Sequence, residues 1–147
     1  MIKNNILKQI RRFGSFNSKS VPLPHTQLHI NGKFVPSLSG QTFETLNPAT
    51  EEAITKVAKA NSEDVNKAVL AARNAFDNGP WSKISGFERA RLMNKLADLM
   101  EKNIESLSAL EALDTGKAYS TVLNVELPLA VEHMRYFAGF ADKINGT

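Results

Sequence analysis

Hydrophobic and polar positions alternate in the first part of the chain, which is the pattern of short β-strands. Residues 27–35 read QLHINGKFV, where two strand-like runs flank Asn31-Gly32. Asn-Gly accepts the positive φ angles of a two-residue hairpin turn, so a β-hairpin is predicted here. Thr42–Leu46 alternates in the same way, and Ala53–Ala58 follows the turn-forming sequence NPAT. Further short strands are therefore predicted at these two runs.

Beyond residue 61 the apolar residues recur every three or four positions, which is the spacing of one helix face. The first such stretch begins at Ser62, a capping residue type, and has acidic residues in its first turn. Asn78-Gly79-Pro80 is predicted to end it. Its apolar face consists of Val65, Ala68, Val69, Ala72 and Phe76.

Three more helical stretches follow. Ser85 and Glu88 form a capping-box pattern ahead of an apolar stripe, and the third stretch is expected to stop at Gly116. The last stretch is predicted to begin near Leu127, because Pro128 fits only a first turn, and to stop at Gly146. The pattern therefore predicts an α+β segment, with a hairpin and short strands followed by about four helices.

Composition and charge exclude several classes of protein. The 147 residues are 42% hydrophobic and 22% charged, which is ordinary for a globular domain. The net charge of +3 comes from residues 1–20, which carry basic side chains and no acidic one. Since the rest of the chain is mildly acidic, nucleic-acid binding is not expected. No apolar run approaches the roughly 18 residues of a membrane helix, so no membrane span is expected.

Residues 1–20 have the composition of a mitochondrial transit peptide. Ile2, Ile6, Ile10 and Phe13 fall on one side of a helix, and Arg11 is among the basic residues largely on the other. We therefore divide the chain into a tail, 1–20, and a globular segment, 21–147, and expect import into the mitochondrial matrix. The alternatives are a surface-seeking or partner-binding helix, or a disordered tail, in a cytoplasmic protein.

The sequence contains few residues or motifs that could carry catalysis or bind a metal or cofactor. The chain has no cysteine, which excludes a thiolate nucleophile, a disulfide and a thiolate metal site. None of its histidines, His25, His29 and His133, has a partner at metal-binding spacing. No G-x-G-x-x-G, Walker or G-x-S-x-G motif occurs, and residues 114–117 (DTGK) resemble a phosphate loop only superficially. We therefore assign no catalytic and no cofactor-binding residue.

Several motifs in order nevertheless point to one family. From about residue 25 onward the chain resembles the N-terminal part of the NAD(P)-dependent aldehyde dehydrogenases. The matching motifs are residues 29–35 (HINGKFV), 44–50 (ETLNPAT), 64–76 (DVNKAVLAARNAF), 79–81 (GPW), 89–99 (RARLMNKLADL), 113–117 (LDTGK), 126–128 (ELP) and 135–143 (RYFAGFADK). Each motif is weak alone, but their order and spacing together are specific.

The resemblance implies an α/β family fold and places this chain in the first quarter of it. The Rossmann-type sheet of the family would begin after Thr147. The cysteine nucleophile, the glutamate base and the cofactor loop that the family uses have no counterpart in the sequence. The resemblance thus implies a truncated N-terminal segment of an enzyme that oxidises aldehydes to carboxylic acids. Alone, it is expected to be inactive and to bind neither NAD nor NADP.

One family site falls inside the chain. Many members hold Na⁺ or K⁺ through main-chain oxygens of a "TxNP" segment and a carboxylate of an "LDxGK" segment. By position these are Thr45, Leu46 and Asp114, and oxygen donors suit such hard cations. A further ligand would come from outside this chain, so no tight site is expected. Ala118 departs from the family's usual proline and makes the turn after Lys117 less rigid.

The sequence is also compatible with two other functions. The chain could be a non-catalytic binding protein that associates with full-length aldehyde dehydrogenase subunits, through helix faces left without burial partners. It could also be an independent helical domain with a role of its own. The aldehyde substrate, the choice between NAD and NADP and the oligomeric state depend on residues that this sequence does not contain.

Overall fold

A computed structural model describes residues 21–143 of the chain. The tail predicted at residues 1–20 and the helix stop predicted at Gly146 lie outside the described residues. Strands β1 (Leu28–Ile30) and β2 (Lys33–Val35) pair antiparallel, with Leu28 opposite Val35. Asn31 and Gly32 have φ angles of 51° and 74°, as the Asn-Gly hairpin signal requires. The predicted hairpin is confirmed.

A second antiparallel pair is formed by β3 (Thr42–Leu46) and β4 (Ala53–Ala58). Thr42 lies opposite Ala58, and the register shifts between Thr45 and Leu46 at an irregularity of the bulge type. Both predicted strands are confirmed. The described residues thus contain two separate two-stranded sheets and no larger sheet.

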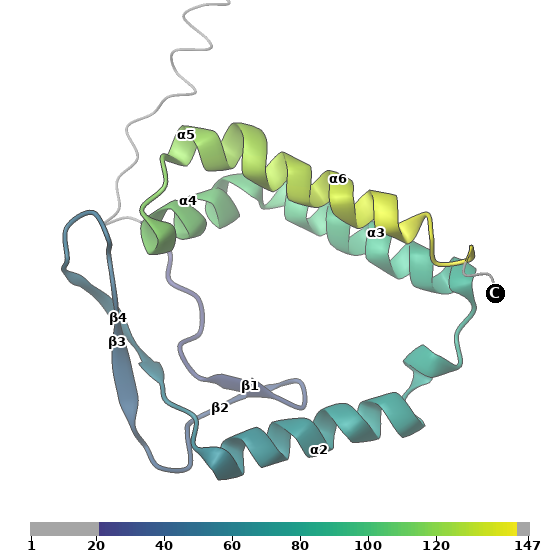
Figure 1. Ribbon diagram of the computed structural model, residues 1–147, viewed down its shortest axis with the longest axis horizontal. Helices are drawn as coiled ribbons and strands as arrows, with labels where there is room; N and C mark the ends of the chain where they lie inside the picture. Colours follow the sequence, from purple (N-terminus) through teal and green to yellow (C-terminus); the bar gives the residue numbers. More distant parts are fainter. Residues whose placement is uncertain (1–20, 144–147) are drawn as a thin grey trace, which may run out of the picture.

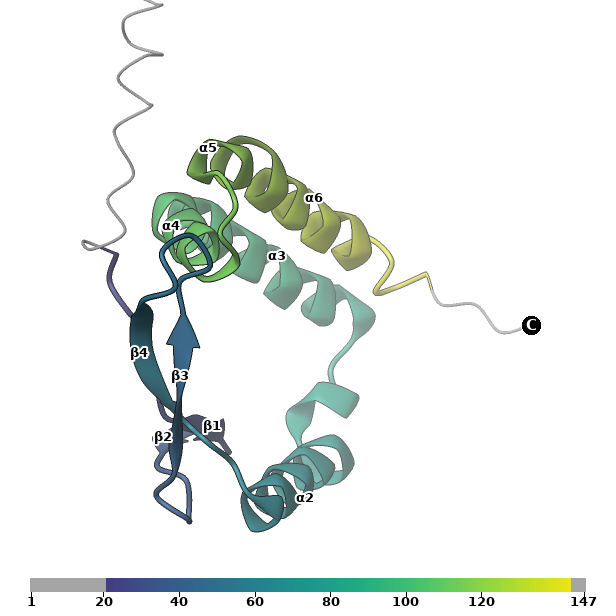
Figure 2. The same ribbon diagram turned by 60° about the vertical axis from the view of Figure 1, so that its left-hand side comes forward.

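The remaining elements are helical. They are α2 (Ser62–Asn78), the 3₁₀ turn η2 (Pro80–Ser82), α3 (Gly86–Lys102), α4 (Ile104–Thr115), the single turn α5 (Tyr119–Thr121), the π-helical turn η3 (Val122–Glu126) and α6 (Leu127–Ala138). In Figure 1, α3 and α6 lie side by side, whereas α2 lies apart from them, beside the β1–β2 hairpin. Figure 2 shows the same separation from a second direction. The expected α+β arrangement of short strands followed by four longer helices is confirmed.

Helix ends follow the predicted signals except at the start of α2 and at the end of α6. Asn61, not Ser62, caps α2: its side chain accepts from the backbone N–H of Asp64 at 3.0 Å, and Asp64 accepts from the N–H of Asn61 at 3.0 Å. The Ser85–Glu88 capping box of α3 is present as predicted. Because asparagine and serine are comparable caps, the acid three positions later selects Asn61.

The last helix is shorter than predicted. It begins at Leu127 with Pro128 in its first turn, but it ends at Ala138 rather than continuing to Gly146. Beyond it, the N–H of Phe140 bonds to Phe137 and that of Ala141 bonds to Ala138, which are tight turns. Gly139 lies where the helix stops, and glycine costs about 1 kcal/mol relative to alanine inside a helix. The prediction missed this nearer stop.

The core lies where α6 packs along α3 and α4. Its buried apolar residues are small or medium-sized: Ala97, Ala112, Leu113, Val122, Val131 and Ala138. Arg135 of α6 reaches across to α3, where its guanidinium donates to Asp98 at 2.7 Å and to Glu101 at 2.6 Å. Small side chains allow the helices to approach closely, and the Arg135 pairs fix how α6 lies on α3.

The connection between α2 and α3 is also held by an arginine. Arg89 donates to the carbonyl oxygens of Trp81, at 3.4 Å, and Ile84, at 3.3 Å, and lies 5.5 Å from the Trp81 ring centroid. This places η2 against the start of α3. No helix within residues 21–143 is long and apolar enough to cross a membrane.

Asp64 joins α2 to the turn that precedes β3. It is 2% exposed and accepts hydrogen bonds from the N–H groups of Asn61 and Leu38 and from the Ser37 hydroxyl, which lies 3.1 Å away. The Asn61 N–H, together with the bonds from Leu38 and Ser37, lowers the pKa of the Asp64 carboxyl, and burial partly opposes this. The ionised carboxylate therefore stabilises this junction.

We predict that Asp64→Asn destabilises the chain at neutral pH and that the difference shrinks in acid. A carboxyl whose pKa is lowered by folding contributes stability above its unfolded pKa and loses it as the pH falls through the folded value. Urea unfolding followed by circular dichroism, at neutral pH and at acidic pH, measures both effects. Asp77→Asn, at an exposed ion pair on the same helix, is the control. An equal loss from both substitutions would contradict the prediction.

Candidate functional site

The predicted cation ligands come from two elements that the fold brings together. Thr45 lies near the end of β3 and Asp114 near the end of α4. The Thr45 hydroxyl donates to Asp114 Oδ1 at 3.2 Å, although 69 positions separate the two residues. Leu46 follows Thr45 directly, at the register shift of the strand pair. The predicted ligands therefore lie in one region of the fold.

The turn after β3 is built on Asn47. Its side chain accepts from the N–H of Ala49 at 2.9 Å, and its carbonyl accepts from Glu51 at 2.8 Å. Glu51 itself has a φ angle of 59°. These bonds fix the turn that carries Pro48, and they confirm the turn predicted from NPAT.

Gly116 allows this turn to approach the end of α4. It caps α4 in the left-handed region, with a φ angle of 73°, as predicted. A Cβ atom at this position would lie only 3.1 Å from the Cβ of Pro48. The left-handed φ angle favours glycine here, and an added Cβ would make a tight contact with the Pro48 side chain.

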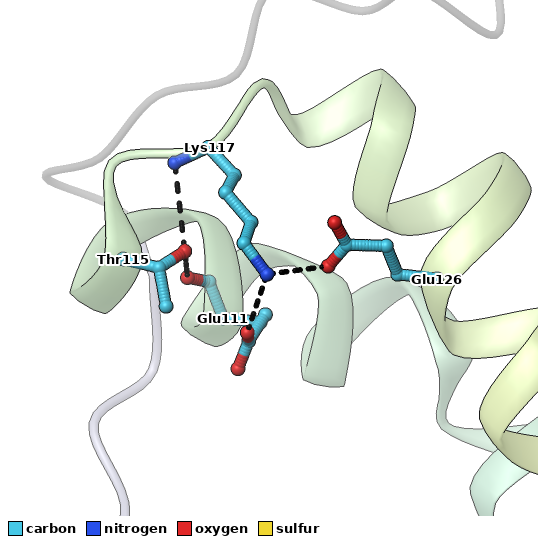
Figure 3. Close-up of polar contacts among 4 residues, drawn as sticks. All are labelled: Glu111, Thr115, Lys117 and Glu126. Atoms are coloured by element: carbon cyan, nitrogen blue, oxygen red, sulfur yellow. Dashed lines mark hydrogen bonds and ion pairs between the residues drawn. The ribbon is translucent and has the colours of Figure 1, made fainter.

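Lys117 links the end of α4 to the start of α6. Figure 3 shows its ammonium between two carboxylates, Glu126 at 2.8 Å and Glu111 at 3.6 Å. The hydrogen bond to Glu126 raises the pKa of Lys117, so the ammonium is fully charged at neutral pH. The Thr115 hydroxyl donates to the carbonyl of Glu111 at 2.6 Å and completes the cluster.

The helix stop was predicted at Gly116, but Glu111 and Glu126 were not predicted as partners of Lys117. Glu111 lies six residues before Lys117, on the preceding helix, and this spacing only weakly indicates an ion pair between them. Glu126 lies beyond α5 and η3, and only the turn between the helices brings it to Lys117. The DTGK sequence therefore serves to join helices.

The donor set at Thr45 and Asp114 suits a hard cation. It offers one carboxylate and one hydroxyl, and both are oxygen donors. Within residues 21–143 there is no group of three or more His, Cys, Asp or Glu side chains that could hold a metal. His25 and His29 instead contact the Phe34 ring, with centroids 3.9 and 4.9 Å away. A singly charged cation fits these residues better than a transition metal.

The sheets within residues 21–143 differ from the sheet of a dinucleotide site. Both sheets are antiparallel and two-stranded, whereas Rossmann-type sites form at the carboxyl ends of parallel strands. A pocket of about 370 Å³ lies beside the Asn47 turn. It is lined by Val21, Leu23, Asn47, Thr50, Glu52, Ala53, Ile54 and Leu113, a set without a basic side chain for phosphate.

Comparisons with known proteins give the family. Residues 34–147 match the model of the aldehyde dehydrogenase family. The chain is 50% identical over 144 residues to Arabidopsis thaliana aldehyde dehydrogenase family 2 member B4, mitochondrial, covering 93% of this chain and 27% of that protein. It is 49% identical over 126 residues to the mitochondrial benzaldehyde dehydrogenase of Antirrhinum majus, covering 86% of this chain and 24% of that protein.

A solved structure agrees with these relatives. The NAD⁺ complex of aldehyde dehydrogenase from Bacillus cereus matches with a TM-score of 0.81 and 46% identity, covering 88% of this chain and 26% of that one. The protein therefore belongs to the aldehyde dehydrogenase family, as its motifs indicated. The chain spans about a quarter of the length of these relatives.

We predict that Gly116→Ala destabilises the chain by more than Gly40→Ala. Forcing alanine into the left-handed region costs about 1–2 kcal/mol at either position. Gly40 has a similar φ angle of 65° but open space around the added Cβ, so it measures the backbone cost alone. The excess at Gly116 measures the contact with Pro48. Urea unfolding gives both values, and equal losses would show that the contact does not matter.

Proposed function

We propose that this chain forms the N-terminal part of an NAD(P)⁺-dependent aldehyde dehydrogenase, an enzyme that oxidises an aldehyde to a carboxylic acid. The observation that carries this proposal is the continuous family match over residues 34–147. The match to the Bacillus cereus fold supports it. In the whole enzyme, this segment would supply the opening hairpins and the α3–α4–α6 core around which other parts assemble.

We also propose that residues 1–147 alone do not catalyse the reaction. The family's chemistry needs a thiolate that attacks the aldehyde, and this sequence contains no cysteine. Hydride transfer needs a bound nicotinamide, and the described residues provide no parallel sheet on which a dinucleotide would lie. The same features argue that neither NAD nor NADP binds this chain alone.

We predict that the pure chain produces no NADH or NADPH when it is given an aldehyde and either cofactor. Absorbance of the reduced nicotinamide, recorded with aliphatic and aromatic aldehydes, is the measurement. The Bacillus cereus enzyme under the same conditions is the positive control. Aldehyde-dependent formation of reduced cofactor by this chain would refute the proposal of catalytic incompetence.

Thr45, Leu46 and Asp114 are proposed to hold Na⁺ or K⁺. The approach of the Thr45 hydroxyl to the Asp114 carboxylate supports this, because it gathers oxygen donors from β3 and α4. Bound there, the cation would join the strand end to the helix end. Its role would be structural, since neither element carries a reacting group.

We predict that KCl raises the thermal midpoint of the chain above its value in choline chloride at equal ionic strength. A ligand that binds only the folded state stabilises it, and choline is too large for the site. Asp114→Asn should remove the difference, because it takes away the charge of the one carboxylate among the proposed ligands. Asp77→Asn, an exposed carboxylate elsewhere, should keep it. A difference unchanged by Asp114→Asn would exclude this site.

Import into the mitochondrial matrix is proposed for the protein. The acid-free, amphipathic composition of residues 1–20 supports it, and two relatives near 50% identity have names that include "mitochondrial". A fluorescent protein fused behind residues 1–20 tests it in cells. Diffuse cytoplasmic fluorescence would favour the cytoplasmic alternative.

A further inference from the structure

The pocket beside the Asn47 turn has no part in the functions proposed above. Its volume is about 370 Å³, which is within the range of pockets that hold small ligands. Three segments enclose it: the start of the described chain, the β3–β4 turn with the first residues of β4, and the end of α4. Figures 1 and 2 both show this turn beside the end of α4. Leu113 of α4 is only 5% exposed, so the pocket reaches the core.

The wall of this pocket combines apolar side chains with a few polar ones. The apolar side chains come from all three segments and are Val21, Leu23, Ala53, Ile54 and Leu113. The polar side chains, Asn47, Thr50 and Glu52, come from the turn and the residues just before β4. Such a wall fits a ligand that has a short hydrocarbon body and one polar end.

Glu52 gives the pocket its charge. It is the one charged side chain of the wall, and within residues 21–143 it forms no ion pair. The bases of the flanking elements pair elsewhere: Lys56 of β4 with Glu44 at 3.8 Å, and Lys117 after α4 with two other carboxylates. An anionic ligand would be repelled by Glu52, whereas a cationic one would be attracted.

The polar atoms near Glu52 accept hydrogen bonds. Thr50 Oγ1 accepts from the N–H of Glu52 at 3.4 Å, and Asn47 Oδ1 accepts from the N–H of Ala49 at 2.9 Å. Hydroxyl and amide oxygens each have a second lone pair. A primary ammonium has three N–H donors and no acceptor, so it matches a wall that offers a carboxylate and two such oxygens.

We propose that this pocket binds a short-chain primary alkylammonium ion, such as n-butylammonium. The ammonium lies at Glu52, and the hydrocarbon chain lies along the apolar wall toward Leu113. The site is distinct from the proposed Na⁺ or K⁺ site, because neither Thr45 nor Asp114 lines the pocket. A quaternary ammonium such as choline has no N–H to donate and binds more weakly. The proposal does not depend on the proposed enzyme activity.

Titration of the ¹⁵N-labelled 147-residue chain with n-butylammonium chloride, followed by NMR, tests the pocket. The amide signals of Asn47, Glu52, Ile54 and Leu113 should shift saturably, with a millimolar dissociation constant. Ethylammonium should bind more weakly, since each buried methylene raises affinity by up to about fourfold. Butyrate and choline at equal ionic strength should cause no saturable shift of these signals. Absence of a saturable shift with n-butylammonium, or equal shifts with butyrate, would overturn the proposal.

Glu52→Gln tests the charge, and Glu51→Gln is the matched control. Both side chains are exposed neighbours in the β3–β4 connection, but only Glu52 lines the pocket. Glu52→Gln should weaken n-butylammonium binding at least about fivefold, because a charge-assisted hydrogen bond is lost. Glu51→Gln should change it by less than about twofold, because an exposed charge outside the site contributes little. Equal losses from the two substitutions would refute the assignment of Glu52.

Leu23→Ala tests the apolar wall independently of charge. Leu23 is 43% exposed, so the chain should keep its fold when this side chain is shortened, and the NMR spectrum checks this. The substitution should weaken n-butylammonium binding more than ethylammonium binding, because only the longer chain reaches along the wall. An equal loss for both ligands would contradict the proposed position of the hydrocarbon chain.

Asp114→Asn separates this pocket from the proposed Na⁺ or K⁺ site. It should change n-butylammonium binding by much less than Glu52→Gln does, because Asp114 does not line the pocket. A loss as large as that from Glu52→Gln would place the ammonium at Thr45 and Asp114 instead, and would overturn the proposal.

Discussion

The packing of α6 on α3 is the most extensive contact between helices of the described residues. Ala97 and Ala138 are fully buried there, and such small side chains let the two helix backbones approach closely. Arg135 adds two hydrogen bonds from α6 to α3, to the exposed carboxylates of Asp98 and Glu101. Glu126, the last residue of η3 before α6, reaches Lys117, and Asp114 at the end of α4 meets Thr45.

The same core buries only part of the apolar surface of residues 21–143. It is made of few residues, most of them small, and leaves the apolar faces of α2 and α3 without cover. Burial by the hydrophobic effect therefore stabilises the packed core but not the open apolar faces of α2 and α3. The family relatives are about four times as long as this chain. A role as the N-terminal portion of such an enzyme, as proposed above, would account for the open faces.

The features that could be predicted from the sequence are the turns and helix caps that neighbouring residues determine. Asn31-Gly32, the Ser85–Glu88 pair and Gly116 each determine backbone geometry through neighbouring residues, and all were predicted. The approach of Thr45 to Asp114 joins distant elements, so only the family resemblance brought them together. The apolar spacing of α2 correctly predicted a helix, but periodicity does not say what covers the face.

Amide hydrogen exchange of the isolated chain compares the stability of its helices. We infer that α3, α4 and α6 form a core of their own, whereas residues 21–143 leave the apolar face of α2 uncovered. We expect slow exchange in α3 and α6, where the core is buried, and fast exchange throughout α2. Protection of α2 equal to that of α3 in a monomeric chain would contradict the account, because α2 would then be stabilised without its partner.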